Sequence, residues 1–321
     1  MSNYSLRPAI TSEAKPLIGL YAESGCGKTK SALLLAKGFV GDMSKVAMIE
    51  TESGRGEVYA DDPIVGGYLV RPIRENFAPA EYGKALTEVE KAGVKVCIID
   101  SASHEWEGAG GVLGMAAKNQ AEGKKGPLVW QQPKMQHQSE FMLRLMQTPI
   151  DLIIVCMRAK YPMEEVIDKG EKKWARSKEL SPKQSEDILY EMMVHAWIDQ
   201  EHALHVTKYT KEDFKQIFLD GQPITTETGQ RLAAWASGKT TAPAPAPAHP
   251  PASPPASAGD AGATHISREQ IAEILSLCEM SGVKTERLLV ASKLKVIEDM
   301  KAGDFDRALA WIAKASKGGA K

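Results

Sequence analysis

The chain has 321 residues, of which 40 are basic and 41 acidic, so its formal net charge is −1. This balance excludes a uniformly basic protein that coats nucleic acid, although a local basic site remains compatible with it. The four cysteines lie far apart and no apolar run approaches the length of a membrane span, so we expect no disulfide framework, zinc ribbon or contact with a membrane. Residues 1–15 lack the apolar stretch of a signal peptide, and the sequence therefore predicts a protein of the cytoplasm.

The first part of the chain alternates strand-like and helix-like segments. An apolar run at 16–21 is followed by a glycine-rich turn and by helical periodicity over 28–39. Further strands are predicted at 46–49, 68–72, 94–99 and 152–157, and further helices at 80–92 and 138–146. This alternation predicts an α/β fold with a mostly parallel sheet. The segments 196–198 and 203–206 flank a polar turn, which predicts a hairpin and hence an antiparallel far edge of the sheet.

A change in composition divides the chain. Between Thr240 and Thr264, 25 residues include seven prolines, nine alanines and no aromatic residue. Such a segment cannot bury a core and favours extended conformations. We therefore predict a large domain at 1–238, a disordered linker at 239–264, a small all-α domain at 265–317 and a short tail at 318–321. Ser267 and Gln270 have the spacing of a capping box at the start of the small domain.

The strongest motif is AESGCGKT at 22–29, which follows a strand and opens a helix. This is the context of a phosphate-binding P-loop, in which backbone N–H groups bind phosphate oxygens. Lys28 would reach the β- and γ-phosphates, and the Thr29 hydroxyl would bind Mg²⁺. Ala22 replaces the first glycine of the usual pattern, which affects the first bend of the loop. The alternative to a P-loop is a glycine-rich turn between a strand and a helix that binds no ligand. The residues predicted to bind ATP here are Glu23, Ser24, Gly25, Cys26, Gly27, Lys28, Thr29 and Lys30.

A second motif ends the apolar strand at 94–99, where Asp100 and Ser101 follow. An acid at this place after a P-loop is the Walker B pattern, and Asp100 would belong to the Mg²⁺ shell. The alternative is an aspartate that caps the next element. Hydrolysis also needs a base that activates water, for which Glu52 and Glu105 are the candidates. Each of these glutamates has the alternative of a solvated loop carboxylate.

The chain resembles the RecA-type ATPase core in three segments, namely the strand–P-loop–helix unit, IETE at 49–52 and IIDS at 98–101. Over about residues 16–210 it is most similar to small phage RecA-like ATPases associated with single-strand annealing proteins. The resemblance implies a catalytic glutamate after the second core strand, which favours Glu52 over Glu105. It also implies a γ-phosphate sensor after the last core strand, where Arg158 is the available residue. The implied function is DNA-stimulated ATP hydrolysis by a ring or filament in phage recombination, repair or replication.

Two segments that we interpret as loops, 108–134 and 159–180, follow the strands after which RecA-like proteins place their DNA-binding loops. Both combine basic and aromatic residues, which suits single-stranded DNA because cations meet phosphates and aromatic rings stack on bases. The DNA-binding candidates are Lys124, Lys125, Trp130, Lys172, Lys173 and Arg176. The alternative is a pair of solvated surface loops, which the acidic residues of the second segment favour.

Lys208 and Lys211 follow the predicted hairpin, and the resemblance makes them candidates for a cation that completes the site of a neighbouring subunit. Exposed lysines at a sheet edge are the alternative. The histidines form no cluster with ligand spacing, so no metal besides Mg²⁺ is predicted. Two other functions remain open. One is an ATP-gated adaptor whose tail recruits an annealing or single-strand-binding protein, and the other is a small-molecule phosphotransferase, against which the absence of an arginine-rich lid argues.

Overall fold

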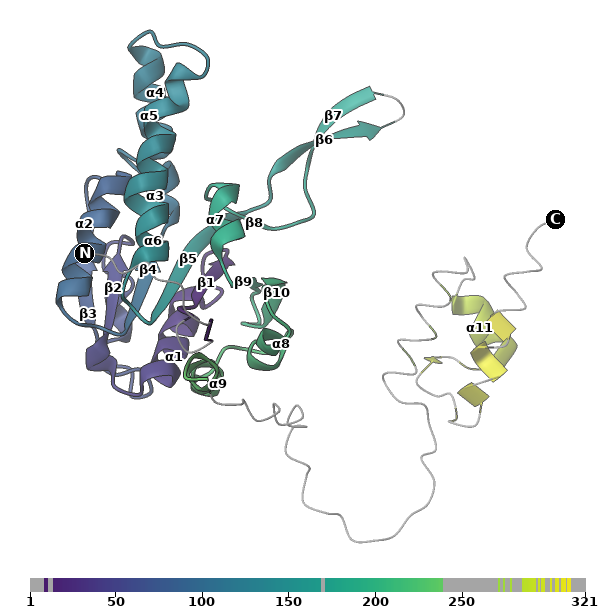
Figure 1. Ribbon diagram of the computed structural model, residues 1–321. Helices are drawn as coiled ribbons and strands as arrows, with labels where there is room; N and C mark the ends of the chain where they lie inside the picture. Colours follow the sequence, from purple (N-terminus) through teal and green to yellow (C-terminus); the bar gives the residue numbers. More distant parts are fainter. Residues whose placement is uncertain are drawn as a thin grey trace. The chain divides into compact units, whose positions relative to one another are not determined.

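A computed structural model of the chain describes residues 9–10, 14–168 and 171–238, together with scattered residues between 271 and 312 (Figure 1). Its contacts divide the chain into two units, Met1–Pro247 and Ala248–Lys321. The division falls within the linker predicted at 239–264, which itself lies outside the described residues, as do the predicted capping box and the tail at 318–321.

The larger unit is built on a sheet of eight strands in the order β10-β9-β1-β5-β4-β2-β3, with β8 paired to β5. The strands are β1 (Leu17–Ala22), β2 (Val46–Glu50), β3 (Leu69–Pro72), β4 (Val96–Asp100), β5 (Leu152–Lys160), β8 (Ser181–Pro182), β9 (Val194–Ile198) and β10 (Leu204–Tyr209). All neighbours in this order run parallel except β9 and β10, and β8 is antiparallel to β5. The predicted α/β class, the mostly parallel sheet and the antiparallel hairpin at its edge are confirmed.

Helices cover both faces of the sheet, which explains why its central strands are apolar along their whole length. On one face α1 (Lys28–Val40) and α9 (Thr226–Ala236) share an apolar cluster with Ile18 and Leu20 of β1. On the other face α2 (Pro79–Lys91) packs with Leu17 and Tyr21 of the same strand. Each fully buried aliphatic side chain stabilises the fold by about 1.5–3 kcal/mol.

Helices α1 and α9 approach each other closely at two glycines. A methyl group on Gly38 would come within 1.8 Å of the Thr226 carbonyl oxygen, and one on Gly229 within 2.2 Å of the Leu35 carbonyl oxygen. The two backbones are therefore in direct contact, and any side chain larger than hydrogen at either position would separate the helices.

The segment 108–134, which we predicted as a loop, is largely helical, so that prediction is wrong. It contains α4 (Val112–Ala121) and most of α5 (Leu128–Gln136), which pack against each other and project from the unit (Figure 1). Five of its six glycines lie outside the helices, with Gly123 and Gly126 at positive φ between α4 and α5, and Gly114 lies within α4. The helix predicted at 138–146 follows α5 directly. It consists of a π-helix, His137–Met142, and then α6 (Leu143–Gln147).

The second predicted loop, 159–180, is also structured. Strands β6 (Met163–Asp168) and β7 (Glu171–Arg176) form an antiparallel hairpin that projects beyond the end of β5, and we call this hairpin the arm (Figure 1). The remaining short helices of the unit are α3 (Ser103–Glu107), α7 (Glu186–Glu191), α8 (Asp213–Ile217) and the 3-10 turns at Met43–Lys45 and Glu57–Tyr59.

The smaller unit has an apolar cluster of its own. Its described residues include helix α11 (Thr285–Ser292), and buried side chains at Ile274, Cys278, Leu288, Ile297, Ala308 and Ile312 pack together. Within the part of this unit that the structure describes, no residue belongs to a strand. In the described parts of both units, no helix has the length and apolar character needed to cross a membrane.

Candidate active site

The glycine-rich loop lies between the carboxyl end of β1 and the start of α1. Gly25 and Gly27 have φ values of 90° and 81°, a left-handed backbone conformation that favours glycine. Gly27 is the N-cap residue of α1 and no described side chain caps this helix end. The backbone donors of the first helical turn are therefore available to an anion, as a P-loop requires.

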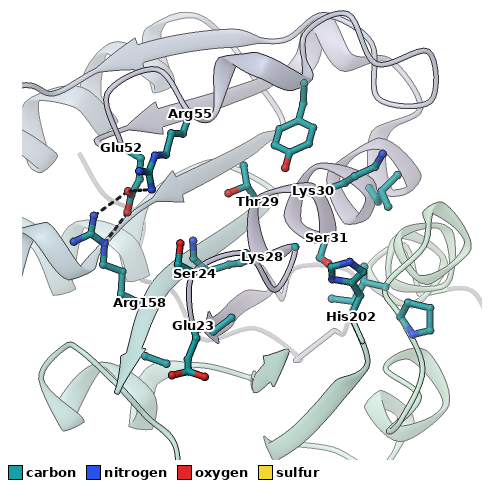
Figure 2. Close-up of a pocket in the computed structure, with 18 of the residues that line it drawn as sticks. Glu23, Ser24, Lys28, Thr29, Lys30, Ser31, Glu52, Arg55, Arg158 and His202 are labelled. Carbon is teal, nitrogen blue, oxygen red and sulfur yellow. Dashed lines mark hydrogen bonds and ion pairs between the residues drawn. The ribbon is translucent and has the colours of Figure 1, made fainter. Parts of the chain in front are cut away.

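A cavity of about 940 Å³ opens beside this loop (Figure 2). Its volume lies within the range of small-molecule sites. Most of the predicted nucleotide-binding residues line it, together with Glu52 and Arg158. The exceptions are Cys26, Asp100 and Ser101, which are buried and are not part of the cavity wall.

Asp100 lies behind the cavity and holds two of its lining residues. Its Oδ1 is 3.1 Å from Lys28 Nζ, and its Oδ2 accepts a hydrogen bond of 2.5 Å from Thr29 Oγ1. The exposed fraction of the side chain is 13% for Lys28 and 2% for Asp100. Burial disfavours the charged form of Lys28, but the Asp100 carboxylate outweighs this effect and raises the pKa of the ammonium group. Lys28 therefore presents a permanent positive charge to the cavity.

Thr29 and Asp100 also form the part of the site that fits Mg²⁺. Their two oxygen atoms lie 2.5 Å apart, and hydroxyl and carboxylate oxygens are hard donors of the kind that Mg²⁺ prefers. Among the described residues, no group of three histidine, cysteine, aspartate or glutamate side chains could hold a metal by itself. Two oxygen donors are fewer than the six of a Mg²⁺ shell, so the remaining ligands would have to come from a bound molecule or water.

Glu52 and Arg158 form a two-pronged ion pair on the cavity wall (Figure 2). Arg158 donates from Nε to Glu52 Oε1 and from Nη2 to Oε2, both at 2.9 Å. Burial by itself raises the pKa of Glu52, but the hydrogen bonds and charge of Arg158 outweigh burial and lower it. The pair thus joins the predicted base and the predicted γ-phosphate sensor in the cavity.

The neighbouring glutamate, Glu50, fixes the loop that carries Glu52. Its fully buried carboxylate accepts hydrogen bonds from the backbone N–H groups of Glu52 and Gly54, at 2.7 and 3.1 Å, and pairs with Arg74. These contacts hold the start of the loop against the end of β2.

Glu105 occupies a different environment from Glu52. It is fully buried and lies outside the cavity wall. Its carboxylate accepts hydrogen bonds from His137 Nδ1 at 2.9 Å and from Gln184 Nε2 at 3.0 Å. Ser101 is also fully buried; its backbone N–H donates to Thr51 Oγ1 at 2.8 Å and its carbonyl oxygen accepts from Tyr82. Both residues connect elements behind the site.

Several lining residues were missed by sequence reasoning. They are Ser31, Leu34, Arg55, Tyr59, Ala159, Lys183, His202, Pro223 and Ile224. His202 lies in the β9–β10 turn, and its Nδ1 is 3.0 Å from the Cys26 carbonyl oxygen. A methyl group on Gly27 would meet the same nitrogen at 2.8 Å, so the turn packs closely on the glycine-rich loop. The predicted hairpin could have indicated His202, because β9 is parallel to β1 and both strands end at the same edge of the sheet.

The DNA-binding candidates lie on two projecting elements and outside the cavity wall. On the helical hairpin, Lys124 donates to Asn119 at 2.5 Å, Lys125 is exposed and Trp130 is 37% exposed. On the arm, Lys172 pairs with Glu165 at 3.1 Å, Lys173 is exposed, and the Arg176 guanidinium lies 4.5 Å from the centre of the Tyr161 ring. Trp174 of the arm is 71% exposed.

The two lysines predicted to act on a neighbouring subunit have local partners. Lys208 Nζ donates to the carbonyl oxygens of Leu189 and Tyr190, at 2.9 and 2.7 Å, at the carboxyl end of α7. Lys211 pairs with Asp213 at 2.6 Å. A role in a neighbouring site would require each lysine to leave these partners.

Comparison of the sequence with protein-family models and with curated proteins finds no match.

Proposed function

We propose that the chain is a RecA-like P-loop ATPase that hydrolyses ATP to ADP and phosphate and acts on single-stranded DNA. The observation that carries this proposal is the arrangement of the P-loop, the Lys28–Asp100–Thr29 contacts and the Glu52–Arg158 pair around one cavity. The strand order supports it, since β5 lies between β1 and β4 and all three end at the edge where ligands bind in open α/β sheets.

Each residue of the site has a definite task in this proposal. The P-loop N–H groups and Lys28 bind the phosphates, and Thr29 and Asp100 would hold Mg²⁺, which neutralises phosphate charge when bound. The Glu52 carboxylate accepts a proton from the attacking water, and Arg158 stabilises the negative charge that develops on the transferred group.

Single-stranded DNA is the proposed partner because of the arm. Its exposed Trp174 offers a stacking surface close to Lys172 and Arg176, which can meet phosphates. Cys26, Cys97 and Cys156 are buried thiols, as is usual in the reducing cytoplasm where we place the protein. A second candidate, the ATP-gated adaptor, is favoured by the separate apolar cluster of the smaller unit, and assembly into a ring or filament stays a prediction.

ATP turnover with and without single-stranded DNA, measured as phosphate release, tests the proposal. We expect turnover that rises with DNA, and we expect Glu52→Gln to bind ATP while hydrolysis stalls, because an amide cannot take a proton from water. Glu105→Gln is the matched control and should remain active. Nucleotide-dependent capture of a partner protein without DNA stimulation would favour the adaptor, and failure to bind ATP would refute both functions. Activity of Glu52→Gln together with loss of activity in Glu105→Gln would reverse the choice of base.

A further inference from the structure

The Glu52–Arg158 pair has a geometry that conflicts with the role of Glu52 as a base. Both carboxylate oxygens of Glu52 accept hydrogen bonds from one guanidinium group, and only 11% of the glutamate side chain is exposed. A carboxylate held in this way is a poor proton acceptor, because the positive charge and the hydrogen bonds stabilise its ionised form. The pair must therefore open before Glu52 can activate water.

Arg158 is built so that its side chain can change partner while its backbone stays in place. Its backbone N–H donates to Ser103 Oγ at 2.9 Å, and its carbonyl oxygen accepts from the Lys183 N–H at 2.7 Å. Its side chain is 41% exposed and lines the cavity. A guanidinium group binds carboxylate and phosphate with the same two-pronged geometry, so a phosphate oxygen can replace Glu52 as its partner.

The charges around the cavity supply a reason for this exchange. Lys28, Asp100, Glu52 and Arg158 interact electrostatically, and Arg55 Nη1 also lies 4.0 Å from Glu52 Oε2, so three positive and two negative charges meet here. A γ-phosphate beside Lys28 adds negative charge near Glu52. Arg158 is then attracted by two anions, the Glu52 carboxylate and the phosphate, and its interaction with the phosphate becomes the stronger of the two. ADP lacks the phosphate that would attract Arg158.

We propose that Arg158 is a latch that holds Glu52 in the nucleotide-free protein and transfers to the γ-phosphate when ATP binds, which releases Glu52 as the base. This inference rests on the proposed function. Beyond the proposed function, it states that Glu52 and the γ-phosphate compete for the side chain of Arg158. ATP binding then includes the cost of opening the pair, whereas ADP binding leaves the pair closed.

A double-mutant cycle read out by binding tests the latch. The dissociation constants of a non-hydrolysable ATP analogue and of ADP, both with Mg²⁺, are measured for the wild type, Glu52→Gln, Arg158→Ala and the double variant. We expect Glu52→Gln to tighten the analogue by about tenfold and to leave ADP within about twofold, because a neutral amide releases Arg158 more easily. In the Arg158→Ala background the same substitution should change the affinity for the analogue by less than about twofold.

Glu88→Gln is the matched control, because Glu88 forms a similar two-pronged pair with Arg71 outside the cavity, at 2.9 and 3.1 Å. This substitution should leave the affinities for the analogue and for ADP unchanged. Arg158→Gln replaces Arg158→Ala if the alanine variant does not fold. If Glu52→Gln raises the affinity for the analogue equally with and without Arg158, the latch is wrong. Direct repulsion between Glu52 and the phosphate would then explain the change in affinity. Equal tightening of ADP and the analogue, or no tightening, would also overturn the latch. A wild-type protein that binds neither nucleotide refutes the proposed function itself and the latch with it.

Discussion

Replacement of Glu105 separates a structural carboxylate from a catalytic one. Glu105→Ala removes the acceptor of the His137 Nδ1–H group and one of the two acceptors of Gln184 Nε2, which also donates to the Ala102 carbonyl oxygen at 2.8 Å; the two residues are 2% and 8% exposed. Each buried donor left without an acceptor costs about 1–3 kcal/mol, so we expect the free energy of unfolding to fall by about 3–5 kcal/mol. Glu105→Gln should cost less, about 1–3 kcal/mol, because its carbonyl oxygen still accepts one bond, while a proton moved to the buried His137 Nε2, which has no partner among the described residues, leaves one donor unpaired.

Urea unfolding followed by tryptophan fluorescence measures this loss, and Trp106, whose ring lies 5.4 Å from that of His137, reports on the region. With a slope of about 3 kcal/mol per molar, the midpoint of Glu105→Ala should fall by about 1–1.7 M. ATP turnover per folded molecule should stay near wild type in both variants. An unchanged midpoint together with turnover as low as that of Glu52→Gln would show that Glu105 acts in the chemistry and would refute the structural role.

Four further outcomes are expected. Lys28→Ala should abolish ATP turnover and weaken nucleotide binding. Because Asp100 then loses its cation, a second variant also carries Asp100→Asn to preserve the fold. Wild-type turnover in either folded variant would contradict the proposed site. A chain ending at Gly238 should keep nucleotide binding and basal turnover but lose DNA affinity or partner capture, and an insoluble product or one unable to bind ATP disproves the boundary. Trp174→Ala should lower the affinity for single-stranded DNA about tenfold, from about 1–3 kcal/mol of stacking per base, with an unchanged unfolding midpoint; unaltered affinity removes the arm from the DNA surface. Burial and the charge of Lys208 lower the pKa of His195 to about 4, below its usual 6.5. Between pH 6.5 and about pH 4 the unfolded chain therefore binds more protons than the folded one, and the free energy of unfolding falls as the pH drops through this range. His195→Gln should flatten this fall, and equal slopes in the two proteins would contradict the reasoning.

The part of the candidate site that could be predicted is the part carried by contiguous residues. The P-loop needs only a strand, a short glycine-rich turn and a helix start in sequence, and periodicity reveals all three. Asp100 was identifiable because parallel strands end at a common edge, where an acid after a buried strand can lie near the P-loop. The antiparallel edge strand followed equally from two short apolar runs around a polar turn.

Contacts between distant segments could not be predicted in the same way. Glu52 and Arg158 are separated by 106 positions and follow different strands, and the sequence indicates where each strand ends but not which charges meet. We predicted a loop at 108–134, whereas all but one of its glycines lie outside the helices and Val112, Ala116 and Asn119 of α4 are buried. Tertiary packing of such short helices outweighs their weak intrinsic preference.

The backbone contact between α1 and α9 has a consequence for the newly made chain. Helix α1 begins at the glycine-rich loop and is the first described helix of the larger unit, while α9 is its last described helix and ends at Ala236. At about 5–20 residues per second, the ribosome needs roughly 10–40 s to pass from one helix to the other. During that interval α1 has no partner at Gly38, and for most of it the turn that carries His202 is also missing. The wall of the cavity is therefore completed late in synthesis, and a fragment that ends before Thr226 should lack the proposed nucleotide binding.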